Sequence, residues 1–233
     1  MKIGIMQPYF FPYIGYFQLI NAVDKFIIYD NIKFTKKGWI NRNRILVNGK
    51  DDYITIPLKK DSDFLNIDQR FLSDSFEEDK IKLLRKIKDT YKKAGYFADV
   101  YPLVESIINN EEKNLFGFVY NSILEICKYL GIKTEFIISS KIKIDHELKS
   151  EHKVLELCKA VGATYYFNPI GGVELYSKDK FKSNNIELNF IKSGSIEYLQ
   201  FDMPFVPWLS IIDVMMFNSK EQIGSMLNFY DLI

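Results

Sequence analysis

The sequence predicts an α/β fold with a mainly parallel sheet that has helices on both faces. Three observations support this class. Short apolar strands alternate with helical segments at both ends of the chain, an Asn-Gly pair marks a β-hairpin, and three helical segments follow one another in the middle. Strands separated by helices are typical of parallel sheets covered on both faces. We expect a single α/β domain over residues 1–233, with residues 44–131 as a hairpin and helical insertion.

The first β-α-β unit is predicted from Lys2 to Asp30. An apolar strand at Ile3–Met6 leads into an aromatic, proline-containing turn at Gln7–Gly15, and an apolar helix and a second strand at Phe26–Tyr29 follow. A turn between a strand and a helix presents backbone N–H groups where anions bind readily. Packing alone does not require so many aromatic residues in a turn, and a binding loop would use them.

A hairpin and three helices are predicted next. The hairpin joins Arg44–Val47 to Tyr53–Leu58 through Asn48-Gly49, a strong turn signal, and residues 59–75 are expected to form a loop or an edge region with a short strand-like piece. The first helix begins with Ser75 and Glu78 as a capping box and carries an apolar stripe; the second begins at Pro102; the third runs from near Asn114 to Gly131. The residues of the stripe are Ile81, Leu84, Ile87 and Tyr91.

The second half of the chain resumes the alternation of strands and helices. The expected elements are a strand at Glu135–Ser139, a helix capped by Ser150 and ended by Gly162, a strand at Thr164–Phe167, the turn Asn168–Gly172 with a helix up to about Lys182, a strand at Ile186–Ile191, and two helices near Trp208–Asn218 and Lys220–Tyr230.

Composition excludes several classes of function. The 233 residues include 31 basic and 30 acidic ones, so no global field attracts nucleic acid, which is not expected as the main ligand. The longest apolar stretches, Phe10–Val23 and Val206–Phe217, are interrupted and shorter than the roughly 20 residues that cross a bilayer. The N-terminus lacks the pattern of a signal peptide, and we expect a cytoplasmic protein.

The cysteines and histidines do not form a metal-binding pattern, and no metal is expected. Cys127 and Cys158 lack ligand spacing and are predicted to be buried free thiols. His146 and His152 are six residues apart, outside the spacing that places two residues on one helix face. His152 lies in the first turn of a predicted helix; a surface position fits it, and it is retained as a second candidate for proton transfer.

Four loops are expected at the carboxyl ends of the strands, where open parallel sheets bind ligands. The first offers Gln7, Tyr9, Tyr13 and Tyr16, either as ligand contacts or as a rigid aromatic turn over the sheet edge. The other three loops are residues 30–44, residues 139–141 with Ser139, and residues 168–174. In the last of these, Asn168, Gly171 and Gly172 form either an anion cradle or a simple tight turn.

The second loop is basic and contains a tryptophan. We predict that Arg42 binds a diphosphate bidentately and that Trp39 stacks on a base or sugar; a solvated charged face is the alternative. Asp30, which follows an apolar strand, is the best candidate for a general base, unless it only caps or pairs with a lysine. The remaining basic residues are Lys33, Lys36, Lys37 and Arg44, and the asparagines that alternate with the arginines are Asn41 and Asn43.

Two further polar residues occur in the late apolar segment. Ser210 and Asp213 are spaced i and i+3 and so share a helix face. They either line the crevice or bond locally. The segment itself fits either a core position or the contact face of a homodimer.

Residues along nearly the whole chain together resemble the WbqC-like protein family. Its members occur in bacterial gene clusters for O-antigen and other surface polysaccharides. The resemblance implies work on a nucleotide-activated sugar, such as N-acylation or aminoacylation of an amino sugar, and it adds Tyr176 to the candidate substrate-binding residues. The matching residues are Gln7-Pro8, Tyr13 to Phe17, Asp24, Asp30, Phe34, Trp39 to Asn43, Pro57, Tyr91, Gly162, Tyr166, Tyr176, Phe181 and Pro207 to Asp213.

A fainter likeness concerns the Rossmann-like nucleotidylyltransferases. Pro12 to Tyr16, followed by an apolar helix, looks like their HxGH region, and Ser139 to Lys143 is similar to their second phosphate-binding motif. Both histidines are tyrosines here, and tyrosine cannot carry the positive charge that stabilises a pentavalent phosphorus. The likeness therefore implies a nucleotide-binding site rather than adenylyl transfer.

Three hypotheses follow. The first is a transferase that joins an acyl or aminoacyl group, from an activated donor, to the amine of a nucleotide-linked amino sugar, with Asp30 accepting the proton. The second is a non-catalytic nucleotide-sugar-binding accessory protein, and the third is an ATP-dependent nucleotidylyltransferase or ligase. The sequence does not identify a cofactor.

Overall fold

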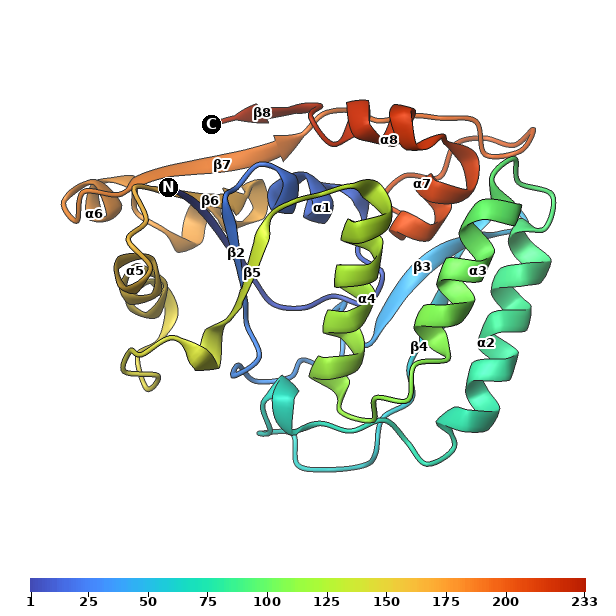
Figure 1. Ribbon diagram of the computed structural model, residues 1–233, viewed down its shortest axis with the longest axis horizontal. Coiled ribbons are helices and arrows are strands. Elements are labelled where there is room, and N and C mark those ends of the chain that lie inside the picture. The colour runs from blue at the N-terminus through green and yellow to red at the C-terminus, as the bar shows by residue number, and fades with distance from the viewer.

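A six-stranded, mostly parallel sheet crosses the computed structural model, which describes residues 1–233 (Figure 1). The strand order is β5-β2-β1-β6-β7-β8; the first five strands are parallel, and β8 runs antiparallel to β7. The predicted α/β fold with a mostly parallel sheet is therefore confirmed. The strands are β1 (Lys2–Met6), β2 (Lys25–Ile28), β5 (Glu135–Ile138), β6 (Tyr165–Pro169), β7 (Glu187–Ser193) and β8 (Tyr230–Leu232).

Helices cover both faces of this sheet, as its apolar strands require. Helix α1 (Ile14–Asn21) packs on the face that carries Phe26 and Phe167, within a core of 45 buried residues. Helices α5 (Ser150–Ala160) and α6 (Lys178–Lys182) contribute to a second core of 14 buried residues that includes Ile3, Ile5 and Ile27 of the opposite face. The alternate residues of each strand thus separate into two cores.

The hairpin forms a separate two-stranded sheet of β3 (Arg42–Val47) and β4 (Lys50–Thr55). Asn48 and Gly49 have φ values of 50° and 75°, the left-handed conformation that a tight hairpin turn requires at both central residues. The predicted turn is confirmed, although the second strand begins directly after Gly49, three residues before the predicted start.

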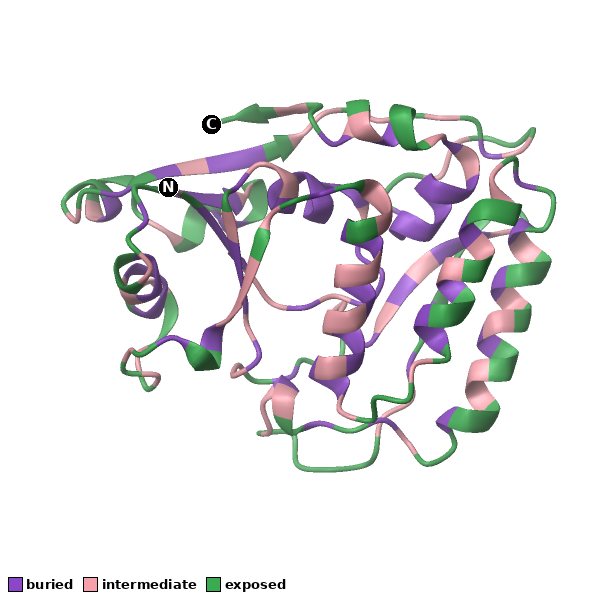
Figure 2. Cartoon of the chain, in the orientation of Figure 1, coloured by how far each residue is buried: buried purple, intermediate pink, exposed green.

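Three helices, α2 (Phe76–Tyr91), α3 (Phe97–Ile108) and α4 (Leu115–Leu130), lie beside the hairpin and bury their inward faces (Figures 1 and 2). The ends of α4 follow the prediction: the Asn114 side chain accepts a hydrogen bond from Gly117 N, and Gly131 ends the helix with φ 74°. Helix α3 begins at Phe97, not at Pro102, because Tyr96 and Phe97 already pack against the core.

The start and stripe of α2 differ from the prediction. Ser75 does not form a capping box: its hydroxyl donates to the Asp79 carboxylate instead of accepting from the helix backbone. Ile81 is 65% exposed, and Leu83 takes its place in the core. The buried face of α2 is therefore rotated slightly from the predicted one, because the hairpin and α3 pack against it. The buried residues are Phe76, Leu83, Ile87 and Tyr91.

Short elements complete the fold. The 3₁₀ turns are η1 (Ile67–Gln69), within the predicted loop, η2 (Ser139–Lys141) and η3 (Ile170–Leu175). Turn η3 replaces most of the helix expected before Lys182. Ser150 is the first residue of α5, with φ 50°, and Lys149 occupies the cap position, so the predicted Ser150 cap is wrong. The last helices are α7 (Ile211–Phe217) and α8 (Lys220–Met226). The predicted final helix overran into β8, which pairs with β7.

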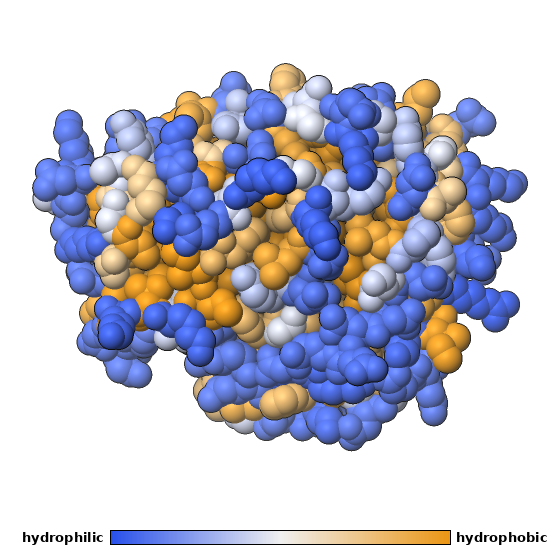
Figure 3. Space-filling model, viewed as in Figure 1, coloured by the Kyte–Doolittle hydropathy of each residue, from blue (hydrophilic) through white to orange (hydrophobic).

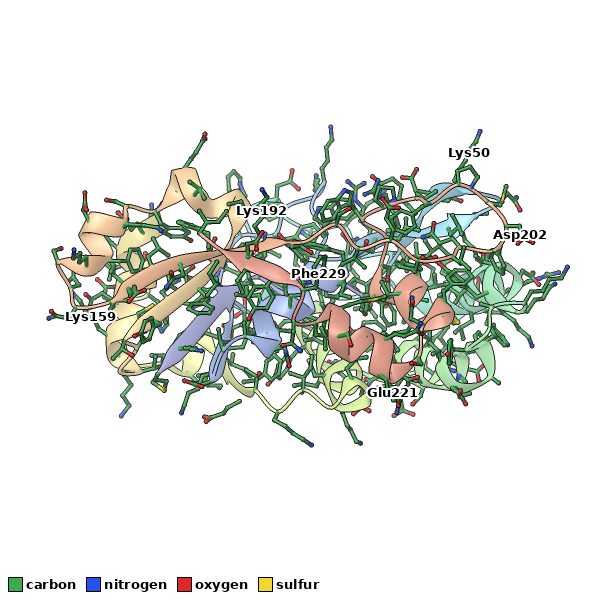
Figure 4. All side chains as sticks on the ribbon, turned by 90° about the horizontal axis from the view of Figure 1, so that it is seen from above. Lys50, Lys159, Lys192, Asp202, Glu221 and Phe229 are labelled. Atoms are coloured by element: carbon green, nitrogen blue, oxygen red, sulfur yellow. The ribbon has the colours of Figure 1, made fainter.

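A long connection, residues 194–210, joins β7 to α7 and is here called the strap. It runs to the tip of the hairpin: in Figure 4 the strap residue Asp202 lies at the same end of the molecule as Lys50. A Cβ at Gly49 would come within 2.6 Å of the Met203 side chain, so the strap packs closely on the hairpin turn. The strap then returns along the first loop to Ser210, whose N–H bonds to the Arg44 carbonyl at 2.8 Å.

Candidate functional site

The first loop, residues 7–13 after β1, is held in a strained conformation by side chains from two other segments. Phe11 has φ 42°, which is unusual for a bulky residue. Its carbonyl accepts hydrogen bonds from the Asn43 amide at 2.9 Å and the Ser210 hydroxyl at 2.8 Å, and Asn43 also donates to the Phe10 carbonyl at 3.0 Å. Such strain persists only where the surroundings impose it, and it is concentrated at functional sites.

Within this loop, hydrogen bonds orient two of the predicted contact residues. The buried Tyr16 hydroxyl donates to the Gln7 carbonyl at 3.0 Å, and the Gln7 amide donates to the Tyr9 hydroxyl at 3.0 Å. The Tyr13 ring lies over Gly15, where an added Cβ would come within 2.3 Å of the ring. Gly15 is therefore the residue that lets Tyr13 fold back over the start of α1.

A cavity of about 520 Å³ opens at the carboxyl ends of β1, β2 and β6. Between β1 and β6 the order of the strands along the sheet reverses, which is where open α/β sheets bind ligands. The volume is typical of a small-molecule site. The cavity brings together nine of the residues predicted to bind substrate: Gln7, Tyr9, Tyr13, Tyr16, Trp39, Asn168, Gly171, Gly172 and Tyr176.

The lining of the cavity is aromatic and contains no charged side chain. Its polar groups are the amides of Gln7 and Asn168 and the hydroxyls of the tyrosines. Burial raises the pKa of Tyr9, Tyr13 and Tyr29 above the ordinary tyrosine value. These hydroxyls therefore stay protonated at neutral pH and serve as hydrogen-bond donors, not as bases.

The hairpin, together with Trp39 just before it, supplies a second set of aromatic and cationic groups beside the cavity. The Trp39 and Tyr53 rings stack with centroids 6.3 Å apart; the Arg44 guanidinium lies 5.4 Å from the Trp39 ring, and that of Arg42 lies 4.8 Å from the Tyr53 ring. Alternate residues of a strand share a face, so Arg42 and Arg44 flank the two rings. The stack fixes the orientation in which Trp39 faces the cavity.

The two paired glycines are not equivalent. A Cβ at Gly172 would come within 2.0 Å of Asn168 Oδ1, whereas a Cβ at Gly171 would meet nothing within 4 Å. The Asn168 amide donates to the Tyr166 hydroxyl at 2.6 Å, and Asn168 is buried. Gly172 is thus the glycine that leaves room for the Asn168 side chain.

Both predicted catalytic residues lie outside the cavity lining. Asp30 is buried, and its Oδ1 accepts hydrogen bonds from the Ser139 hydroxyl at 2.8 Å and from Ser140 N at 2.9 Å. These bonds join the ends of β2 and β5, so the structure uses Asp30 and Ser139 to connect two strands. His152 is exposed on α5, with Nε2 3.1 Å from Lys180 Nζ.

The polar and basic residues of the predicted second loop, residues 30–44, largely stabilise the conformation of that loop. The Arg42 guanidinium donates to the carbonyls of Lys37 at 2.7 Å and Gly38 at 3.2 Å, and the Lys37 side chain is exposed. The Asn41 amide donates to the Ile56 carbonyl at 2.8 Å. These residues and Asn43 fold the loop around Trp39; of this group only Trp39 lines the main cavity.

Asp213 and Ser210 belong to the support of the site. Asp213 is fully buried; Oδ1 accepts from the Tyr91 hydroxyl, and Oδ2 accepts from the Tyr198 hydroxyl and the Gln200 amide, each at 2.7 Å. Burial raises its pKa, because the three donors are neutral and no cation offsets the lost hydration. Asp213 thus ties the strap and α2 to α7, and Ser210 caps α7 while holding Phe11.

Several lining residues were not among the predicted contacts. Tyr29 and Ile32 follow β2, and Ile170 and Leu175 belong to η3. Tyr29 was assigned to a strand, yet its place at the end of that strand was a signal that it faces the ligand edge. Ile170 and Leu175 are exposed apolar residues in a loop, a weaker signal that only the structure makes specific.

Other features of the chain do not provide a competing site at this edge. A hollow of about 570 Å³ lies near the amino-terminal ends of β6 and β7, around Thr164 and Glu187, away from the edge where parallel sheets bind ligands. No group of three or more His, Cys, Asp or Glu residues is placed to hold a metal ion. Cys127 and Cys158 are free and buried, and burial raises the pKa of each thiol to about 12. None of the helices combines the length and the apolar character that crossing a membrane would require.

Fold and site together define an α/β protein with a mostly parallel sheet and an uncharged aromatic cavity at the carboxyl edge of that sheet. The chain belongs to the WbqC-like protein family, which matches residues 7–225. It is 32% identical over 233 residues to the uncharacterized protein Rv1507c of Mycobacterium tuberculosis (strain ATCC 25618 / H37Rv), covering 98% of each chain. No solved structure matches.

Proposed function

We propose that this protein binds a nucleotide-activated sugar, with the sugar in the 520 Å³ cavity. The observation that carries the proposal is the lining: rings of Trp39 and several tyrosines, amides of Gln7 and Asn168, and no charge. A pyranose presents C–H groups on its faces and hydroxyls around its rim. Aromatic rings pack against the C–H faces, and phenol and amide groups form hydrogen bonds with the hydroxyls.

The topology supports a nucleotide at the same edge. Numbered along the chain within the sheet, the parallel strands have the order 3-2-1-4-5, as in Rossmann-like folds, and the cavity lies where this order reverses. Helices α2 to α4 and the hairpin share the 45-residue core with α1. We therefore infer a single Rossmann-like domain in which residues 44–131 are an insertion that packs on the same core.

We place the protein in the assembly of a bacterial surface polysaccharide, such as O-antigen, in the cytoplasm. Family membership motivates this role, and the neutral cavity agrees with it. No lining residue is a carboxylate, an imidazole or a lysine, so the lining itself fits recognition of the sugar better than chemistry upon it. Binding without turnover, as in an accessory protein, is the function that the geometry supports best.

Acyl or aminoacyl transfer to a sugar amine is the second candidate, and Lys153 favours it. Lys153 is a buried lysine that does not itself line the cavity; its Nζ lies 5.7 Å from the centre of the Tyr29 ring, and Tyr29 lines the cavity. Burial lowers the pKa of Lys153, so its neutral amine is accessible nearer neutral pH. In this reaction the sugar amine attacks the acyl carbon of a thioester, the C–S bond breaks, and Lys153 takes the ammonium proton.

Calorimetric titration with UDP-, dTDP- and GDP-linked sugars, including amino sugars, tests the proposal. We expect saturable binding of at least one of them. Adding acyl-CoA or an aminoacyl donor, with product detection by mass spectrometry, separates the two candidates: acylated sugar that disappears in Lys153→Met identifies a transferase, and binding without product identifies an accessory protein. Absence of binding to every nucleotide sugar would overturn both.

A further inference from the structure

A smaller chamber of about 150 Å³ adjoins the aromatic cavity. It is lined by Tyr9, Tyr13, Trp39, Asn43, Arg44 and Trp208, and three of these residues, Tyr9, Tyr13 and Trp39, also line the cavity. Trp208 belongs to the strap and meets the Tyr13 ring edge-on at 5.9 Å. The two spaces therefore share a wall, and one extended ligand can occupy both.

Arg44 is the one charged residue that lines the chamber. Its Nη1 pairs with the Asp51 carboxylate at 3.0 Å, and its Nη2 makes a long bond of 3.4 Å to the Trp208 carbonyl. Its Nε is buried and has no hydrogen-bond partner. A buried N–H without a partner is costly, and its presence beside a cavity calls for an acceptor that arrives with a ligand.

The unused part of Arg44 has the geometry for an anion. Nε–H and one Nη–H of a guanidinium point in the same direction and form a fork that matches two oxygens of a phosphate. In Arg44 the Asp51 carboxylate takes Nη1, which leaves Nε free and Nη2 weakly engaged. Arg42 lacks this freedom, since both Nε and Nη2 donate to backbone carbonyls of the loop.

We infer that the chamber binds the phosphates of the nucleotide-activated ligand through Arg44, and that the rings of Trp39 and Trp208 flank them. The identity of the ligand as a nucleotide sugar rests on the proposed function, whereas the binding of an anion at Arg44 does not. The division of labour follows the chemistry: the neutral cavity receives the neutral sugar, and the adjoining cation receives the charged linker. The Asp51 carboxylate places a negative charge on the same guanidinium, so removing that charge favours binding of an anion.

Calorimetry on the full-length chain tests the inference, with pyrophosphate, UDP, dTDP, GDP and the corresponding nucleotide sugars as probes. Arg44→Gln should weaken the tightest nucleoside diphosphate at least about tenfold, as expected for loss of a bidentate charge-assisted contact. Arg44→Lys should recover only part of the affinity. Arg85→Gln, which removes an arginine whose side chain is 83% exposed on α2, is the matched control and should bind like the wild type.

Asp51→Asn gives an independent measurement, because a structural role of the ion pair does not predict tighter binding. We expect its affinity for the same probe to rise several-fold and its thermal unfolding to stay near that of the wild type, since the Asp51 side chain is 44% exposed. Nucleotide-sugar binding that is unchanged in both Arg44→Gln and Asp51→Asn would overturn the inference and leave the proposed function intact. Arg44-dependent binding of pyrophosphate or nucleoside diphosphate, without any binding of nucleotide sugars, would support the chamber and overturn the sugar site.

Discussion

The hydroxyl of Ser139 donates a 2.8 Å hydrogen bond to the carboxylate of Asp30, and this bond joins the end of β2 to the turn after β5. Ser140 N adds a second bond to the same oxygen at 2.9 Å. The carboxylate that the sequence offers as a general base is thus engaged in holding two strand ends together, next to the cavity and not in its lining.

Replacing Asp30 should therefore affect stability more than ligand binding. Asp30→Ala leaves the Ser140 N–H without its acceptor, while the Ser139 hydroxyl keeps Asn31 Oδ1 at 2.7 Å, and we expect the free energy of unfolding to fall by about 1–3 kcal/mol. Asp30→Asn retains an acceptor oxygen and should lose less. Urea unfolding measures the loss. Unaltered stability of Asp30→Ala combined with abolished turnover would restore Asp30 as the base.

The difference between the paired glycines gives a matched pair of variants. Gly172→Ala forces its Cβ against Asn168 Oδ1, so we expect a loss of about 1–3 kcal/mol of stability and weaker binding of the nucleotide sugar. Gly171→Ala meets open space and should behave like the wild type. Thermal unfolding and calorimetry of the two variants provide the comparison. Equal effects would show that the Asn168 contact does not shape the site.

Tyr13 in the first loop and Tyr16 in α1 should show different effects on ligand binding and on stability. The Tyr13 hydroxyl is available to a ligand, so Tyr13→Phe should weaken sugar binding severalfold with stability within about 0.5 kcal/mol of the wild type. The Tyr16 hydroxyl holds the Gln7 carbonyl, so Tyr16→Phe should also lower the free energy of unfolding by about 0.5–1.5 kcal/mol. The reverse order of stability losses would contradict the assignment.

Asp213 makes the stability of the fold depend on pH. Its pKa is raised in the folded chain, so ionisation costs more in the folded state than in the unfolded one. The contribution of Asp213 to stability is then fully present below the ordinary carboxyl pKa of about 3.9 and is lost as pH rises through the raised value. Asp213→Asn is neutral at every pH. The stability of the wild type relative to this variant should be greater at pH 4 than at pH 7, as measured by denaturant titration; a difference that grows with pH would contradict the account.

Much of the fold could be predicted because its signals are local. The Asn-Gly turn, the Asn114 and Gly131 caps and the alternation of strands and helices depend on neighbouring residues only. The start of α3, the turn η3 and strand β8 depend on contacts across the molecule. Tyr230 and Leu232, for example, become a strand by pairing with β7, which a helical pattern at the C-terminus does not reveal.

The site was predictable to the extent that strand ends are predictable. Loops that follow β1 and β6 had to meet, and they supply most of the tyrosines and all of the side-chain amides and glycines of the cavity. Residue type alone does not distinguish a ligand contact from a polar side chain that satisfies buried backbone groups, as Asn43 and Ser210 do at Phe11. Arg42 and Arg44 share a strand face, and only the loop carbonyls that bind Arg42 show which arginine is free.

The apolar residues on the face shown in Figure 3 form a band that hydrophilic residues border. This distribution does not mark the site, because the proposed ligand is held by aromatic rings and hydrogen bonds within a cavity rather than by an exposed apolar surface.

Trp39→Ala should weaken binding by roughly 1–3 kcal/mol through lost stacking. Phe64→Ala, at a ring that is 82% exposed and outside the cavity, is its control and should leave the affinity measured by calorimetry unchanged.

A crystal structure of the chain with a bound nucleotide-linked sugar tests the central claim most directly. We expect the pyranose between Trp39 and Tyr176, within hydrogen-bond distance of Gln7 or Asn168, and the phosphates beside Arg44. Ligand density at the opposite edge of the sheet, around Thr164 and Glu187, with the aromatic cavity empty, would contradict it.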